Sequence, residues 1–287
     1  MNYKIVCDSS ANLFSLPGVP YTTVPMKVVT AEREYVDEPQ LDVHSMVADL
    51  KVYKGKSGSS CPNVQEWLDA FGDADAVFGI TITKHLSGSY NSAQQAATVY
   101  MEENPGKKAY IFDSLSTGPE MMMIVDKIRE LAEAGLDFEA VKEQVLEYHN
   151  HNHTLFCLQS MNNLARNGRV SPAVAKIAGF LGIRAVGDAK GGQITPVHKP
   201  RGEKKALQHL VEMMGERGLR EGGLVRIAHC FGEETANTLV EMVKAKHPTC
   251  RFILEPTAAL CSFYAEEGGM IIGFEGGFNE HNDNRKF

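Results

Sequence analysis

The chain has 287 residues, of which 43% are hydrophobic and 23% are charged, the balance of a globular protein with a buried core. Its net charge of −7 argues against nonspecific binding to nucleic acids or to anionic lipid surfaces. No apolar run approaches the roughly 20 residues of a membrane span, and the first residues predict a strand rather than a signal peptide, so we expect a cytoplasmic protein.

In the first 150 residues, short apolar runs of strand length alternate with longer amphipathic runs of helix length. Strands are predicted at 3–8, 21–29, 76–81 and 108–112, and helices at 42–51, 64–71, 89–102, 121–134 and 138–150. This alternation is typical of a parallel sheet whose strands are joined by crossover helices.

The second half mixes a hairpin with further helices. Strands are predicted at 154–158, 184–188, 193–198, 224–229, 251–255 and 270–274, and helices at 160–167, 172–180, 202–217, 232–246 and 258–265. The Lys-Gly-Gly run at 190–192 suits a hairpin turn. We therefore predict an α/β protein with two domains. These are a parallel-sheet N-terminal domain at 1–152 and an α+β C-terminal domain at 153–280, followed by a polar tail at 281–287.

Two hydroxyl-rich segments stand out as candidate binding elements. Residues 86–93 read Leu-Ser-Gly-Ser-Tyr-Asn-Ser-Ala, and they place Ser87, Gly88 and Ser89 between a predicted strand and the start of a predicted helix. The first turn of a helix has unpaired N–H groups and a favourable dipole for anions. A second cluster, which contains Ser59 and Ser60, lies upstream. Together they predict one pocket for a small anion, with a carboxylate favoured. The first segment could instead be a simple helix N-cap, and the second a plain polar loop.

Arg169 follows Gly168, which suits the left-handed position that ends a helix. Two roles remain open for this arginine at this stage. Its guanidinium could interact with the last carbonyl groups of the helix, or it could supply a positive charge for an oxyanion in a cleft between the domains.

Neither a metal site nor a catalytic motif is indicated. The six cysteines are scattered without a Cys-x-x-Cys pair, so we expect buried free thiols. His149, His151 and His153 alternate where a transition metal is conceivable, but they lie at a helix end without a neighbouring cysteine or acid, and we expect no metal. The sequence lacks Gly-x-Ser-x-Gly, His-Glu-x-x-His and Gly-x-Gly-x-x-Gly.

Several segments, in order along nearly the whole chain, resemble the DegV family of bacterial fatty-acid-binding proteins. Matching segments lie at 5–13 (the Asp-Ser-Ser turn after the first strand), 59–63, 82–93 (the Leu-Ser-Gly-Ser-Tyr turn), 113–114, 164–171 and 192–201. No single segment is decisive, but their order and spacing are specific.

The resemblance implies a two-domain fold with one long-chain fatty acid buried between the domains and its carboxylate held near the surface. It also implies that a separate ATP-dependent fatty acid kinase phosphorylates that carboxylate for phospholipid synthesis. Carried over by position, the carboxylate ligands would be Ser59, Ser60 and the turn formed by Ser87, Gly88 and Ser89. Arg169 and Arg201 would lie at the rim or face the partner.

One departure concerns a histidine near the end of many family members, in a His-x-Gly-Pro-Gly motif. Tyr264 falls at the position where that histidine is expected, and Glu266-Glu267 replaces the Gly-Pro pair. A tyrosine hydroxyl can donate a hydrogen bond to a carboxylate, but it supplies no positive charge at neutral pH. Tyr264 therefore joins the predicted ligand-binding residues.

The sequence thus predicts a lipid carrier with no catalytic residues of its own and no cofactor, whose bound ligand is a long-chain fatty acid. Two alternatives stay open. The first is a serine hydrolase or acyltransferase that uses Ser87 or Ser89, and the second is a sensor that binds a small anion, such as a phosphate or a sugar derivative, at the same helix terminus.

Overall fold

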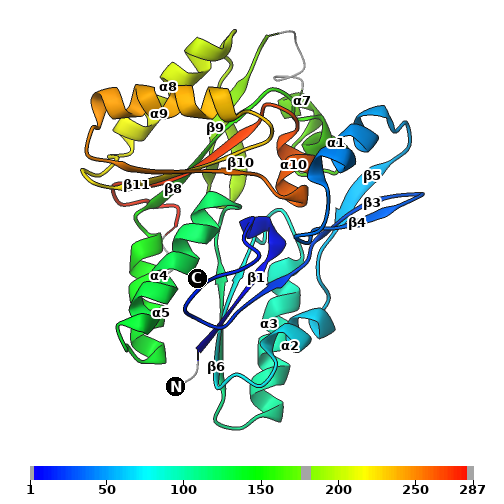
Figure 1. Ribbon diagram of the computed structural model, residues 1–287, viewed down its shortest axis with the longest axis vertical. Coiled ribbons are helices and arrows are strands. Elements are labelled where there is room, and N and C mark those ends of the chain that lie inside the picture. The colour runs from blue at the N-terminus through cyan, green and yellow to red at the C-terminus, as the bar shows by residue number, and fades with distance from the viewer. Residues whose placement is uncertain (1–2, 176–181, 283–287) are drawn as a thin grey trace.

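The computed structural model describes residues 3–175 and 182–282, and the strands in this part of the chain form three sheets. A four-stranded parallel sheet has the order β2-β1-β6-β7, a six-stranded mixed sheet has the order β10-β9-β8-β13-β11-β12, and a small sheet has the order β4-β3-β5 (Figure 1). The predicted α/β fold, with a parallel sheet followed by a mixed α+β part, is confirmed.

The parallel sheet is covered by helices on both faces. Its strands are β1 (Tyr3–Asp8), β2 (Tyr21–Val24), β6 (Ala76–Thr81) and β7 (Lys108–Asp113). Its helices are α2 (Val64–Phe71), α3 (Ser89–Glu103), α4 (Pro119–Glu133) and α5 (Phe138–His149). Helices α2 and α3 pack on one face and α4 and α5 on the other, so every residue of the central strand β6 is buried. This explains why β6 is a continuous apolar run rather than an alternating one.

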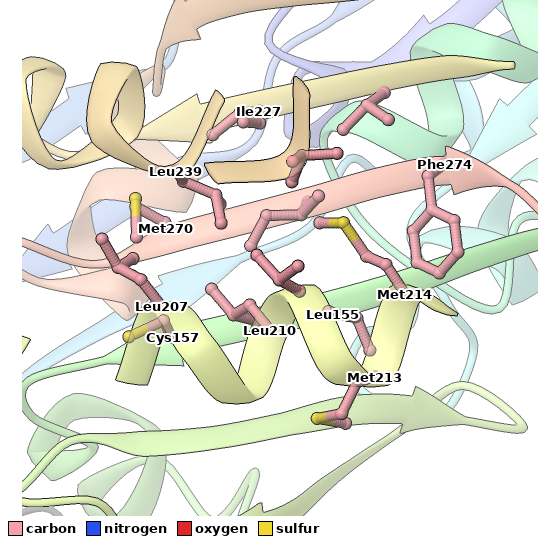
Figure 2. Packing of buried hydrophobic residues seen from close by; sticks show 14 of the residues in the cluster. Leu155, Cys157, Leu207, Leu210, Met213, Met214, Ile227, Leu239, Met270 and Phe274 are labelled. Atoms are coloured by element: carbon pink, nitrogen blue, oxygen red, sulfur yellow. The ribbon is translucent and has the colours of Figure 1, made fainter. Parts of the chain in front are cut away.

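The mixed sheet has its own core beneath two helices. Its strands are β8 (Asn152–Leu158), β9 (Ala185–Lys190), β10 (Gln193–His198), β11 (Leu224–His229), β12 (Arg251–Pro256) and β13 (Met270–Glu275). Helices α8 (Glu203–Glu216) and α9 (Glu233–Lys246) cover one face. Figure 2 shows Leu207 and Leu210 of α8 packed against Leu155 and Cys157 of β8. Helix α4 contacts β8, β11 and β13, and it thereby joins the two large sheets.

The small sheet corrects two sequence-based predictions. Residues 21–29 were predicted as one strand, but they form β2 in the parallel sheet and β3 (Lys27–Thr30) in the small sheet, because Pro25 interrupts the run. The serine-rich segment, for which a plain polar loop was one interpretation, contains β5 (Ser57–Ser60). Strand β5 pairs with one edge of β3, and β4 (Glu34–Val36), which was not predicted, pairs with the other edge. Its polar, small residues lack the usual β-strand signal.

Helix α10 (Ala259–Ala265) lies near the end of the sequence, but it packs beside the small sheet, whose strands come from the first part of the chain. Ala259 and Phe263 share a buried cluster with Val28 and Tyr35 of the small sheet and with Met46 of α1 (Val43–Val52). Figure 1 shows α10 next to α1. This contact brings side chains that are more than 200 residues apart in the sequence to one place.

The remaining elements are short. They are the 3-10 helix η1 (Ser9–Ala11), α6 (Asn162–Arg166) and α7 (Pro172–Ala175). The predicted helix at 172–180 and the predicted tail at 281–287 extend into residues 176–181 and 283–287, which lie outside the described residues. The predicted domain boundary after residue 152 falls at the first residue of β8 and stays a prediction. Among the described residues, no helix has the length and apolar character needed to span a bilayer.

Candidate functional site

A largely apolar cavity lies where the three sheets meet. A mostly apolar lining with a few polar groups is usual for small-molecule sites. The loops at the carboxyl ends of β6 and β7 contribute to it, as do β8, the β9–β10 hairpin and one face of α10. Apolar lining residues include Met26, Ile82, Leu86, Phe156, Leu158, Leu164, Ile194, Leu260 and Ile271.

The two serine-rich segments that the sequence singled out meet at this cavity. Ser59 of β5 and Ser87 of the turn before α3 both line it. The segments touch, because a Cβ atom added to Gly88 would lie 3.3 Å from the Sγ of Cys61. Tyr264 also lines the cavity, and its hydroxyl is 2.7 Å from the Oγ of Ser59. Three hydroxyl groups from β5, the turn and α10 are therefore gathered at one end.

The other predicted serine and glycine ligands do not line the cavity. Ser89 is fully buried, and its hydroxyl donates to the carboxyl group of Asp8 at 2.7 Å. Ser60 is exposed on β5, and Gly88 is the N-cap residue of α3. The Oγ of Ser87 accepts a hydrogen bond from the N–H of Ser89 at 3.2 Å. This contact tightens the turn. Of Ser87, Gly88 and Ser89, Ser87 is the residue that lines the cavity.

The two predicted rim arginines differ in position. Arg169 lines the cavity, and its Nε donates to the carbonyl oxygen of Leu86 at 3.1 Å. Its guanidinium carbon lies 6.0 Å from the centre of the Tyr264 ring, so a positive charge adjoins the three hydroxyls. Arg201 is exposed and forms a backbone bridge with Ile183, outside the cavity lining.

Sequence reasoning missed two buried carboxyl groups that fix the walls of this end. Asp8, the last residue of β1, accepts hydrogen bonds from the N–H of Ile82 at 3.0 Å and from the hydroxyl of Ser89. It thereby holds the turn that carries Ser87. Asp8 belongs to the recognised Asp-Ser-Ser segment, but nothing local showed that its partners lie more than 70 residues away.

The second carboxyl group, Asp37, caps helix α10. It accepts hydrogen bonds from the N–H groups of Ala259 at 2.8 Å and Leu260 at 3.1 Å, and from the hydroxyl of Ser9 at 2.9 Å. An acidic group at a helix N-terminus satisfies unpaired N–H groups and complements the dipole. Because it lies more than 220 residues from its helix, no sequence-local capping pattern could reveal it.

A second polar group that sequence reasoning missed lies at another part of the cavity wall. The hydroxyls of Ser116 and Thr154, both lining the cavity, are 2.6 Å apart. Thr154 donates to the buried carboxyl group of Glu120, which also lies 3.1 Å from the Nε2 of His149 and from the Nδ2 of Asn282. The hydroxyl of Thr154 therefore already has an acceptor, Glu120, outside the cavity lining.

The three alternating histidines contact separate partners. The Nε2 of His149 lies 2.9 Å from the carbonyl oxygen of Ser114, that of His151 lies near Glu147, and that of His153 lies 3.0 Å from the carbonyl oxygen of Gly277. Within residues 3–175 and 182–282, no cluster of three or more histidine, cysteine or acidic side chains could hold a metal ion.

A sequence model described as "Uncharacterised protein, DegV family" matches residues 2–275. A DegV domain-containing protein of Streptococcus pneumoniae is 36% identical over 280 residues, which cover 96% of this chain and 99% of the relative. This chain belongs to the DegV family.

Two solved DegV-family structures resemble this DegV protein closely. One is a DegV family protein from Eubacterium eligens loaded with heptadecanoic acid, with a TM-score of 0.93 and 38% identity. The other is the Fatty Acid Kinase (Fak) B3 protein of Streptococcus pneumoniae loaded with linoleic acid, with a TM-score of 0.93 and 36% identity. Each match covers 96% of this chain and 99% of the other.

Burial dominates the electrostatics of this DegV protein's cavity walls. It raises the pKa of the Cys261 thiol, which lines the cavity, to about 12, so that this side chain is neutral. Burial also raises the pKa of the Asp8 carboxyl. It raises the pKa of the Asp37 carboxyl to about 6, although the N–H groups of Leu260 and Ala259 act in the opposite direction.

The raised pKa of Asp37 predicts a pH dependence of stability. The folded protein binds this proton more tightly than the unfolded chain, in which an aspartate has a pKa of about 3.9. The contribution of Asp37 is therefore fully present below about pH 4 and is lost as the pH rises through about 6. The free energy of unfolding of Asp37→Asn relative to wild type should rise by about 2 kcal/mol between pH 4 and pH 7, as measured by urea denaturation.

Asp42→Asn is the control for this measurement. Asp42 is an exposed cap of α1, and its hydrogen bonds to Ser45 lower its pKa, so its contribution is lost as the pH falls. The two variants should thus change stability with pH in opposite directions. Parallel pH profiles for both would contradict the assignment of a raised pKa to Asp37.

Proposed function

We propose that this protein binds one long-chain fatty acid in the cavity and holds the carboxylate beside Ser59, Ser87 and Tyr264. The observation that carries the proposal is an apolar cavity with the hydroxyls of Ser59, Ser87 and Tyr264 at one end, in a fold shared with proteins that were solved with fatty acids bound. Each buried CH₂ group contributes about 0.8 kcal/mol, so the acyl chain supplies most of the affinity.

The polarity of the wall favours this orientation of the ligand. At the end formed by Ser59 and Tyr264, two hydroxyls bonded to each other can turn toward an acceptor, and Arg169 places a positive charge nearby. At Thr154 the hydroxyl already donates to Glu120, so it cannot donate to a carboxylate as well, and a carboxylate there would approach a second carboxyl group. The carboxylate therefore belongs at the first end and the methyl group at the other.

We further propose that the bound carboxylate is presented to a separate, ATP-dependent fatty acid kinase. This step is supported by the likeness to the Fak B3 protein over 96% of the chain. Hydroxyl ligands satisfy a carboxylate without neutralising it, and they leave one oxygen available as a nucleophile. Phosphoryl transfer depends mainly on positioning and charge stabilisation, which the kinase would supply together with ATP. Location in the cytoplasm stays a prediction from the sequence.

The hydrolase alternative has less support. A nucleophilic serine needs a base within hydrogen-bonding reach. Among the described residues, the hydrogen bonds of Ser87 and Ser89 lead to each other and to Asp8, not to a histidine. Hydrolysis of a p-nitrophenyl ester that disappears in Ser87→Ala would revive this alternative.

Native mass spectrometry of the protein purified from its expression host tests the binding function directly. We expect a co-purified mass corresponding to one fatty acid of about 14 to 18 carbons, because such a chain gains about 0.8 kcal/mol per buried CH₂. A ligand-free protein whose mass is unchanged by added palmitate or oleate would contradict the proposal.

The double variant Ser59→Ala/Tyr264→Phe tests the position of the carboxylate. It removes two hydroxyl donors and keeps the apolar wall, and a hydrogen bond to a charged group is worth about 1.5–3 kcal/mol. The dissociation constant, measured by displacement of a fluorescent fatty acid, should rise about tenfold or more. The control is Ser60→Ala on the same strand, which removes an exposed hydroxyl and should leave affinity unchanged. Equal affinities in all three proteins would refute the site.

Arg169→Ala separates binding from presentation. Because the guanidinium already donates to the carbonyl oxygens of Leu86 and Asn167, it is not needed as a direct ligand, and its removal should leave fatty-acid affinity close to wild type. It should lower the rate of kinase-dependent acyl-phosphate formation about tenfold or more, the effect of one lost charge-assisted hydrogen bond. Arg251→Ala, which changes an exposed arginine on β12 outside the cavity lining, is the matched control. If Arg169→Ala abolishes binding itself, the arginine is a direct ligand and the division of roles is wrong.

A further inference from the structure

The apolar cavity is separated from a second, polar cleft by a thin partition. The lining of this cleft includes the charged side chains of Lys190, Glu216 and Arg217. Thr154 and Ala189 are the residues that belong to the lining of both spaces. One side of this pair thus faces the apolar cavity, and the other side faces a polar cleft.

The two partition residues are neighbours across adjacent strands. Thr154 lies on β8 and Ala189 on β9, and these strands pair antiparallel with Leu155 opposite Asp188. The next position in this register sets Thr154 opposite Ala189. Side chains at opposed positions of an antiparallel pair lie on the same face of the sheet about 5 Å apart, so the two form a continuous barrier.

This partition lies away from Tyr264 along β8. Leu158 shares a buried cluster with Tyr264, and Thr154 precedes Leu158 by four residues, about 13 Å along a strand. Tyr264 and Cys261 lie about one helical turn apart on α10. The Sγ of Cys261 is 3.5 Å from the Oγ1 of Thr117, and the adjacent Ser116 bonds to Thr154 at 2.6 Å. The cavity therefore extends from Tyr264 along α10 and past the β7–α4 loop to Thr154.

Polar bonds on the outer side hold the partition in place. The hydroxyl of Thr154 donates to Glu120, which is itself bound by Asn282. Next to Ala189, Asp188 forms an ion pair with Arg217. Moving either strand outward would break a buried or half-buried polar interaction, which is costly. The barrier should therefore act as a fixed stop and not as a deformable apolar wall.

We propose that Thr154 and Ala189 are the specificity-determining residues that set the maximum acyl-chain length, an inference that rests on the proposed binding of fatty acids. Each CH₂ group that fits in front of the partition should raise affinity about fourfold, the equivalent of about 0.8 kcal/mol. A longer chain would have to enter the polar cleft or buckle, so affinity should stop rising with length at a defined carbon number.

The test measures the dissociation constants of saturated fatty acids from about ten to about twenty carbons by displacement of a fluorescent fatty acid. Affinity plotted against carbon number should rise and then level off, and the carbon number at which it levels off is the break in slope. Ala189→Leu adds bulk to the inner side of the partition, and it should move the break in slope to shorter chains by about two to three carbons, with a loss of about fourfold per excluded CH₂. Thr154→Ser removes a methyl group but keeps the hydroxyl for Glu120, and it should move the break to longer chains.

Two control variants test whether a moved break reflects the space available to the acyl chain or a general loss of structure. Thr154→Val keeps the size of the side chain and removes the bond to Glu120. It should leave the break at the wild-type carbon number, which depends on side-chain size, and make the break less sharp, because the wall is held less firmly. Val197 lies on the same hairpin, but it is half-exposed and outside the cavity lining. Val197→Leu should therefore leave both the affinities and the break unchanged.

The outcomes also distinguish this inference from the proposed function. If wild type binds fatty acids but its break in slope is the same in Ala189→Leu and Thr154→Ser, the partition does not set chain length and the inference alone is overturned. If wild type binds none of the acids, the proposed function fails and the inference fails with it. Opposite shifts in the two variants would support both.

Discussion

Two buried carboxyl groups, Asp8 at the end of β1 and Asp37 directly after β4, hold the walls of the cavity together. Asp8 accepts hydrogen bonds from Ile82 and Ser89, and Asp37 accepts them from the start of α10. A buried carboxyl group is tolerated only when its oxygens are satisfied, so each aspartate requires a distant segment to come to it. The serines of η1 connect the two, because Ser9 donates to Asp37 and Ser10 to Asp8. The turn before α3 and helix α10 therefore converge on one point.

This convergence gives the cavity two chemically different ends. At one end, Ser59, Ser87 and Tyr264 offer hydroxyl groups beside the guanidinium of Arg169. At the other end, the hydroxyl of Thr154 is bound to Glu120 and the wall borders a polar cleft. An amphiphile with one anionic group and one apolar chain matches this arrangement in a single orientation. The same asymmetry would orient the carboxylate for a partner enzyme and limit the length of the chain.

Much of the fold could be predicted from the sequence because its main signals are local. The buried strand β6 and the helices that cover it follow from apolar runs and amphipathic periodicity. The small sheet could not be predicted, since β5 consists of serine and glycine and is stabilised by its pairing with β3 rather than by its own composition. The resemblance to the DegV family located the serine segments and Arg169, although it could not distinguish Ser87, which faces the cavity, from Ser89, which is buried against Asp8.

The sequence by itself determined the alternation of strands and helices, the family, and the two serine-rich segments, because each is encoded in a short stretch of neighbouring residues. Only the tertiary structure decided which hydroxyls face the cavity, that Tyr264 bonds to Ser59, and that Thr154 and Ala189 separate the cavity from the polar cleft. These features depend on contacts between residues far apart in the chain, such as the 205 positions between Ser59 and Tyr264. Such contacts arise from the packing of the sheets against α10, and local patterns of residues do not specify them.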